Sequence, residues 1–206
     1  MPTVVYPEVT VTWPKGWCPD KVEPRKSWVS NDYLRICIDL DGVVCEYDFP
    51  KIVKDFFGID LDASDIYAYD LPDVLVVSQQ EINAMFEKQV YGSPTLVKGA
   101  AVTLTDWQSQ GHELIIYSNR VKYMGETELI RWLKKYRIPF NFLTNGHGQY
   151  DVHIDDSAAK LMATNSRKKL LYTQPWNKRC LNIKRQLIRV LNWKEVNYFV
   201  YTLLDD

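Results

Sequence analysis

The sequence predicts an α/β fold in which a parallel sheet carries helices on both faces and a small helical cap follows the first core strand. Two observations support this prediction. Positions 34 and 36–38 are apolar, and Arg35 is the one charged residue near the start of this run; a run without regular polar alternation is typical of a strand buried on both faces of a parallel sheet. After residue 93, short apolar segments alternate with stretches of helical periodicity. A chain of 206 residues is long enough for one such domain with an insertion.

The chain divides into three parts. Residues 1–33 form an N-terminal extension rich in Trp and Pro, whose role the sequence does not indicate. Residues 34–48 and 93–206 are expected to form the core. Residues 49–92 are expected to form the cap, because this insertion is too long for a loop without secondary structure of its own.

Two helices are predicted in the cap. The first spans residues 49–57 and ends at Gly58. The second begins at Ser78, which forms a capping-box pattern with Glu81, and runs to about residue 90. Aromatic residues of the cap, such as Phe86, are expected to serve core packing more than base stacking.

In the core, each predicted strand is followed by a helix. Strands are expected at residues 34–38, 112–117, 140–143, 152–154 and 170–173. Helices are expected at residues 96–110, 126–136 and 158–163, and from Trp193 onward behind an Asn192 cap. His112 is expected at the surface, whereas His153 lies within a strand and is expected to be a buried, hydrogen-bonded residue rather than a metal ligand.

Polar side chains follow three of these strands. They are Asp39 and Asp41, then Ser118, Asn119 and Arg120, and finally Asp155 and Asp156. The carboxyl ends of parallel strands meet at one edge of a sheet, so these groups are expected to converge there. Taken alone, the first pair also fits a solvated Asp-rich turn, but the convergence of three such groups favours a site.

Each of these residues has a role in phosphoryl transfer. Asp39 is the expected nucleophile, and Asp41 is the expected acid that protonates the leaving oxygen and later activates water. Ser118, Asn119 and Arg120 are the expected phosphate ligands. The expected ligands of Mg2+ are the four acids Asp39, Asp41, Asp155 and Asp156.

The same segments resemble a known superfamily. The sequences IDLDGVV (38–44), IYSN (116–119) and HIDD (153–156) resemble motifs I, II and IV of the haloacid dehalogenase superfamily of phosphohydrolases. YDL (69–71), LLYTQPWN (170–177) and RVLNW (189–193) resemble the cytosolic-type 5′(3′)-deoxyribonucleotidase branch and its bacterial and phage relatives.

This resemblance implies a Rossmann-like core with a small helical cap, and Mg2+-dependent hydrolysis of a small phosphorylated substrate, with a nucleoside monophosphate as the substrate expected first. Two alternatives stay open: a phosphatase of the same fold acting on a sugar phosphate or other small ester, and a non-catalytic binding module. A homo-oligomer is neither indicated nor excluded.

The chain departs from the family pattern at one position. Relatives usually carry a Lys shortly before the acidic motif, where it pairs with the nucleophile and the phosphate. Here the stretch reads GHGQYD (146–151), so His147 is the expected catalytic residue at that position. A histidine is only partly charged near neutral pH, which predicts modest activity that declines as the pH rises.

Composition limits the choice of partners and compartment. The formal net charge is −1, which gives no electrostatic reason to expect nucleic-acid or membrane-surface binding. Four cysteines without a CxxC pair favour a reducing, cytoplasmic compartment. No apolar run approaches membrane-spanning length, and no signal peptide is evident. We therefore expect no membrane and no nucleic-acid partner.

Overall fold

The computed structural model describes residues 3–6, 9–12, 33–62, 65–66, 74–90, 94–145, 148–178, 180 and 187–203. His147, the YDL sequence and the Trp-rich part of the N-terminal extension lie outside the described residues. No helix within the described ranges is long and apolar enough to cross a membrane.

A parallel sheet organises the described part of the chain. It has six strands in the order β10-β9-β8-β3-β6-β7, and every neighbouring pair is parallel. The strands are β3 (Arg35–Asp39), β6 (Glu113–Tyr117), β7 (Phe142–Thr144), β8 (Gln149–Asp155), β9 (Asn165–Tyr172) and β10 (Ile188–Val190). The predicted α/β fold with a parallel sheet is confirmed.

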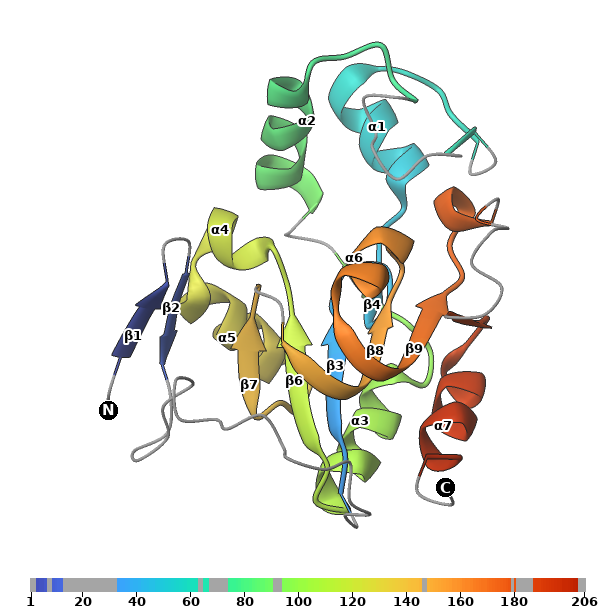
Figure 1. Ribbon diagram of the computed structural model, residues 1–206. Coiled ribbons are helices and arrows are strands. Elements are labelled where there is room, and N and C mark those ends of the chain that lie inside the picture. The colour runs from blue at the N-terminus through green and yellow to red at the C-terminus, as the bar shows by residue number, and fades with distance from the viewer. Residues whose placement is uncertain are drawn as a thin grey trace.

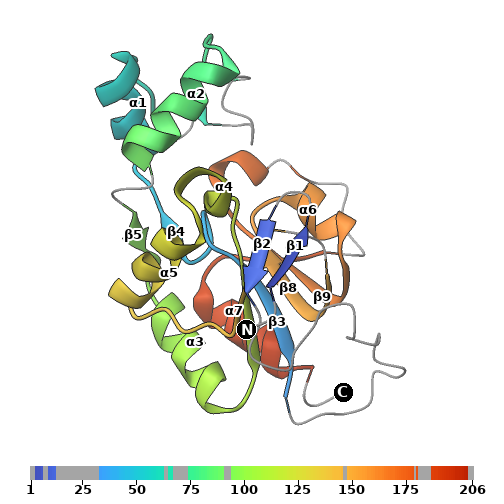
Figure 2. The same cartoon turned by 90° about the vertical axis from the view of Figure 1, so that its left-hand side faces the viewer.

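Helices cover the sheet. In chain order, the core helices are α3 (Ala100–Ser109), α4 (Arg120–Met124), α5 (Glu126–Lys135), α6 (Ala158–Ala163), the 3-10 turn η5 (Pro175–Asn177) and α7 (Trp193–Tyr201). Figure 2 shows α3 and α5 on one side of the strands and α6 on the other. As predicted, Asn192 caps α7, since its side chain accepts hydrogen bonds from the backbone N–H groups of Lys194 and Glu195.

The central strand β3 is apolar on both faces. Ile36 and Ile38 are fully buried in the main core, which also contains side chains of α3, α5 and α7. Cys37 points to the opposite face and packs with Ile115 and Tyr150. Burial on both faces explains why the sequence of β3 lacks polar alternation.

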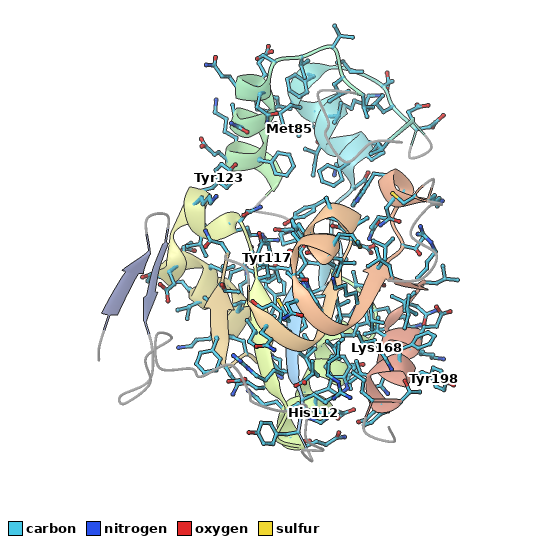
Figure 3. All side chains as sticks on the ribbon, viewed as in Figure 1. Met85, His112, Tyr117, Tyr123, Lys168 and Tyr198 are labelled. Atoms are coloured by element: carbon cyan, nitrogen blue, oxygen red, sulfur yellow. The ribbon has the colours of Figure 1, made fainter. Side chains whose placement is uncertain are left out.

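A second, smaller hydrophobic cluster lies beyond the carboxyl ends of the strands (Figure 1). It belongs to α1 (Phe49–Phe57), α2 (Gln79–Met85) and the π-helical turn η4 (Phe86–Val90), which we call the cap. Buried residues of the cap include Ile52, Val53 and Met85, the last of which is labelled in Figure 3. The Ser78–Glu81 capping box is present as predicted.

A short antiparallel ribbon joins the cap to the core. β4 (Cys45–Glu46) leads into the cap and β5 (Thr95–Leu96) leads out of it, and the two strands pair with each other. A separate antiparallel pair, β1 (Thr3–Tyr6) and β2 (Val9–Thr12), lies beside the edge strand β7 (Figure 1).

Three local predictions need correction. The segment expected as one helix from residue 96 begins as β5, and its helix starts only at Ala100, after Gly99 takes a left-handed conformation (φ 93°). α4 and β10 were not predicted, because each has only three to five residues. His112 is buried rather than exposed, and its Nδ1 accepts a hydrogen bond from the backbone N–H of Leu34 (3.2 Å) at the end of the sheet away from the cap (Figure 3).

Candidate active site

Strand register brings the predicted polar groups to one edge of the sheet. β3 lies between β6 and β8, with Ile38 paired to both Ile116 and Ile154. Each of these three paired residues is followed, one or two positions later, by a polar residue: Asp39, Ser118 or Asp155. The three polar residues therefore lie side by side at the carboxyl ends of their strands. The cap lies beyond the same edge (Figure 1).

Three of the four predicted metal ligands form a compact group. Asp39, Asp155 and Asp156 each offer a carboxylate oxygen, and these atoms lie within 4.8 Å of one another. All three residues are buried. Within the described part of the chain, Asp155 Oδ2 and Asp156 Oδ1 are buried without a hydrogen-bond partner. Buried carboxylate oxygens that lack donors are expensive unless a cation satisfies them, so this group fits a hard divalent ion such as Mg2+.

The charge balance of this group supports the same interpretation. Burial raises the pKa of Asp39 and of Asp156, and the carboxylate of Asp155 raises both pKa values further. Lys160 opposes the rise in both cases. A bound divalent cation would oppose the raised pKa of Asp39 and of Asp156 and favour their ionised forms.

The structure supplies a lysine that the sequence analysis did not identify. Lys160 lies in α6, directly after the acidic motif, and its Nζ is 3.2 Å from Asp39 Oδ2 and 3.8 Å from Asp155 Oδ2. Its ammonium also lies 4.9 Å from the ring centre of Tyr117, a residue at the middle of Figure 3. Among the described residues, a lysine thus lies beside Asp39 on the helix that follows the acidic motif.

Asp41 lies apart from the three-acid group and pairs with Arg120. Arg120 is fully buried, and its Nε donates to Asp41 Oδ1 (2.9 Å) and Oδ2 (3.1 Å), while Nη2 donates to Oδ1 (2.5 Å). The hydroxyl of Tyr47 also donates to Asp41 Oδ1. Arg120 was predicted as a phosphate ligand, and in the structure its guanidinium bonds to Asp41, the predicted acid and base. Asp41 was predicted as a metal ligand, and its carboxylate is outside the three-acid group.

The other two predicted phosphate ligands differ in exposure. Ser118 is buried at the end of β6, and its Oγ accepts a hydrogen bond from the backbone N–H of Arg120 (3.1 Å). Asn119 is exposed. Ser118 therefore lies at the edge shared by the acids, whereas nothing in the described contacts ties Asn119 to them.

Gly42 allows the loop after β3 to approach the acidic group closely. Its φ is 83°, and a side chain at this position would overlap Asp156 Oδ2. The same Cβ would lie 3.4 Å from the indole of Trp176. Glycine is thus required here for both conformation and space.

The C-terminal motifs brace these loops. Asn177 Nδ2 donates to the backbone carbonyls of Asp156 (2.8 Å) and Tyr172 (2.7 Å). Gln174 Nε2 donates to the carbonyl of Gly42 (2.7 Å), and Trp193 Nε1 donates to that of Val43 (2.9 Å). The sequences LLYTQPWN and RVLNW therefore hold, through hydrogen bonds to backbone carbonyls, the loop that follows Asp41 and the segment that contains Asp156.

His153 is buried beneath the site, as predicted. Thr164 Oγ1 donates to the carbonyl of Leu161 (3.0 Å), so it accepts from His153 Nδ1 at 2.9 Å. His153 Nε2 then faces Asp155 Oδ2 at 3.5 Å. The imidazole is thus buried and hydrogen-bonded to Thr164 through Nδ1.

Aromatic rings from the core and the cap gather beside Gly42. Phe49 of α1 packs against Tyr47 (ring centres 5.6 Å apart), Phe86 of η4 (6.0 Å) and Trp176 of η5 (6.1 Å). Trp176 Nε1 is buried without a hydrogen-bond partner among the described residues. We call Tyr47, Phe49, Phe86 and Trp176 the aromatic cluster.

The sequence analysis did not assign Lys160, Tyr47 or Trp176 to the site, although the sequence contains a signal for Lys160. Lys160 is the only basic residue in the predicted helix at 158–163, and a helix starting at the acidic motif turns its third position back toward the strand ends. Nothing in the sequence marks Tyr47. Trp176 belongs to the LLYTQPWN sequence, but its place beside the cap depends on how the cap packs on the core.

Residues 33–204 match the family described as 5′ nucleotidase, deoxy (Pyrimidine), cytosolic type C protein. The protein named "Putative nucleotidase YqfW" of Bacillus subtilis (strain 168) is 25% identical over 179 residues, with 79% of this chain and 91% of that protein covered.

Solved structures share the fold. The haloacid dehalogenase-like hydrolase SP0104 of Streptococcus pneumoniae superposes with a TM-score of 0.50 at 14% identity, covering 82% of this chain and 99% of that one. A structure titled "a predicted phosphatase from Clostridium acetobutylicum" gives a TM-score of 0.51 at 11% identity with the same coverage. The predicted fold class and superfamily resemblance are confirmed.

Proposed function

This chain belongs to the cytosolic type C family of 5′ nucleotidases, so it is a phosphatase or nucleotidase of the haloacid dehalogenase superfamily, and we propose that it hydrolyses nucleoside monophosphates with Mg2+ through a phosphoryl-Asp39 intermediate. The observation that carries this proposal is the buried group of Asp39, Asp155 and Asp156 within 4.8 Å, with Lys160 Nζ 3.2 Å from Asp39.

Asp39, Asp155 and Asp156 would hold the ion. When bound, Mg2+ would neutralise the charge that the carboxylates and the substrate phosphate bring together. The buried oxygens of Asp155 and Asp156 that lack hydrogen-bond donors support this assignment. We assign Asp41 no side-chain bond to the metal, because its carboxylate is engaged by Arg120 and Tyr47.

The protein residues would then divide the chemistry between them. A carboxylate oxygen of Asp39 attacks phosphorus, and the ammonium of Lys160 attracts the phosphate and favours the ionised nucleophile. Asp41 gives a proton to the leaving oxygen, and later takes one from the water that hydrolyses the phosphoryl-Asp39. The hydroxyl of Ser118, at the same sheet edge, would bind a phosphoryl oxygen.

The aromatic cluster supports a nucleoside as the leaving group. It joins cap and core beside Gly42, so a ligand whose phosphate lies at Asp39 would extend toward these rings. A base has a flat face for stacking and polar edges, and the buried Trp176 Nε1 offers an unused donor within the described contacts. A sugar phosphate would leave both features unused.

The proposal is tested by measuring phosphate release from purified protein. The panel should contain ribo- and deoxyribonucleoside 5′- and 3′-monophosphates, ribose 5-phosphate and glycerol phosphate, each with Mg2+ and with a chelator. We expect Mg2+-dependent release that is fastest with nucleoside monophosphates. Faster release from the sugar phosphates would favour the alternative substrate class. No release from any ester, with Mg2+ still bound, would favour a non-catalytic module and contradict the proposal.

A further inference from the structure

Tyr47 connects the cap to the residue that we assign as acid and base. It lies between β4 and α1, at the point where the chain passes from core to cap (Figure 1). Its ring packs against both the main core and the hydrophobic cluster of the cap. Its hydroxyl, at the other end of the side chain, donates to Asp41 Oδ1 and accepts from Arg120 Nη2.

The two oxygens of Asp41 are held unequally. Oδ1 accepts from Arg120 Nε, Arg120 Nη2, the Tyr47 hydroxyl and the thiol of Cys45. Oδ2 receives one of the described bonds, the longer one from Arg120 Nε at 3.1 Å. Because Oδ1 is occupied by four donors, Oδ2 is the oxygen left to carry a proton toward a substrate. The Asp41 side chain is 32% exposed, so one side of it remains accessible.

The groups that hold Asp41 are themselves fixed. The guanidinium of Arg120 lies 4.7 Å from the ring centre of Trp132 and 5.6 Å from that of Tyr47. Burial lowers the pKa of Arg120, but Asp41 outweighs that effect and the pKa is raised overall, so Arg120 stays charged. Burial, and secondarily Asp41, raises the pKa of Tyr47, so its hydroxyl keeps its proton and remains a donor.

We propose that Tyr47 is a positioning residue which, together with Arg120, orients Asp41 so that Oδ2 delivers a proton to the leaving oxygen of the substrate. This inference rests on the proposed phosphatase function. In the step concerned, a bond forms between an Asp39 oxygen and phosphorus while the bond from phosphorus to the leaving oxygen breaks. The electron pair of the broken bond stays on the leaving oxygen, which takes the proton from Asp41 Oδ2.

The choice of substrate separates this role from a structural one. A nucleoside leaves as a strongly basic alkoxide unless it is protonated, whereas p-nitrophenolate is a weak base that leaves without an acid. The value of kcat/KM reports the steps up to departure of the leaving group, so hydrolysis of the intermediate does not affect the comparison. A misplaced Asp41 therefore lowers kcat/KM for the nucleotide and not for p-nitrophenyl phosphate.

The experiment compares wild type with Tyr47→Phe, which keeps the ring and removes the hydroxyl. With Mg2+ present, kcat/KM is measured for a nucleoside monophosphate and for p-nitrophenyl phosphate. We expect a loss of about tenfold for the nucleotide, consistent with one hydrogen bond to a charged group, and little change for p-nitrophenyl phosphate. Tyr198→Phe, the same change at an exposed position of α7 (Figure 3), is the matched control and should change neither value.

Each outcome bears on a different claim. Equal losses on both substrates would show that Tyr47 only supports the fold, and an unchanged nucleotide rate would show that its hydroxyl does not position Asp41. Either result would overturn the inference while leaving the phosphatase function intact. A wild-type protein that hydrolyses neither ester would overturn the proposed function and this inference with it. Arg120→Lys, which keeps the charge but loses the paired donors, should reproduce the substrate-selective loss.

Discussion

Lys160 Nζ lies 3.2 Å from Asp39 Oδ2, although the two residues are 121 positions apart in the chain. The contact forms because Ser157 caps α6 directly after the acidic motif, so the first turn of the helix brings Lys160 back over the end of β3. A cation beside Asp39, the proposed nucleophile, thus comes from the C-terminal side of the acidic motif. Lys160 is therefore a second candidate, beside His147, for the cation of the proposed mechanism.

Lys160→Met should lower kcat/KM by about 100-fold, as is typical when one electrostatic partner of a transferring group is removed. The variant retains the length of the side chain and loses its charge. Lys194→Met, at an exposed position of α7, is the control and should behave as wild type. Steady-state phosphate release measures the effect. A Lys160→Met enzyme with normal kcat/KM would show that another cation serves the phosphate.

His147→Ala distinguishes the two candidate cations. Since Lys160 already pairs with Asp39, we expect the alanine variant to retain nearly all activity and to show the pH dependence of wild type. The predicted decline of activity above neutral pH would then be absent in both proteins. Loss of activity in His147→Ala, with Lys160→Met unaffected, would instead support the role that the sequence predicted for His147.

Removing the metal should destabilise the protein more at higher pH. The raised pKa values of Asp39 and Asp156 mean that these acids bind protons more tightly in the folded chain than in the unfolded one, where the pKa is about 4. Without a cation, their contribution to the free energy of unfolding is most favourable at low pH and declines as pH rises through the raised values. Mg2+ opposes that decline.

Thermal unfolding with Mg2+ and with a chelator, over a series of pH values, checks this expectation. The Tm difference between the two conditions should grow as pH rises, and taking the difference cancels contributions from acids elsewhere in the chain. Asp156→Asn should flatten the dependence. A Tm difference that is the same at every pH would argue against the buried acids as the metal site.

Trp176→Phe should impair nucleotides selectively. The substitution keeps a ring near Phe49 and removes the buried Nε1 donor. We expect kcat/KM for the nucleoside monophosphate to fall by about tenfold, mainly through KM, while that for ribose 5-phosphate changes little. Kinetic assays of both substrates measure this. Equal effects on both would indicate that Trp176 packs against Gly42 without contacting the base.

The strand ends of the site were predictable because local signals and topology agree there. Asp39 and Asp155 each follow an apolar run, and the carboxyl ends of parallel strands must share an edge. The position of Ser118 at this edge was predictable by the same rule, because it follows the apolar strand β6. The fold class required no more than the apolar centre of β3, Ile36 to Ile38, and the alternation of strands and helices that follows it.

The partners of these residues were less predictable, since they depend on side-chain packing. Arg120 shares a strand end with Ser118, and its position alone fits a phosphate ligand as well as it fits a partner of Asp41. The burial of its guanidinium beside Trp132 and Tyr47, which no local sequence pattern indicates, supports the role as partner of Asp41. Likewise, the aromatic cluster arises from segments more than 100 positions apart, and no local pattern brings Phe49 to Trp176.

The central claim is that Asp39 is the nucleophile, and it can be tested by looking for phosphate on that residue. Asp41→Asn should slow hydrolysis of the intermediate, because the amide cannot activate water. After mixing this variant with Mg2+ and p-nitrophenyl phosphate, acid quenching and peptide mass spectrometry should find one phosphoryl group on Asp39. Chelator or the added change Asp39→Asn should abolish it, with the fold retained by circular dichroism. Turnover of wild type with phosphate on no residue, or on a residue other than Asp39, would contradict the account.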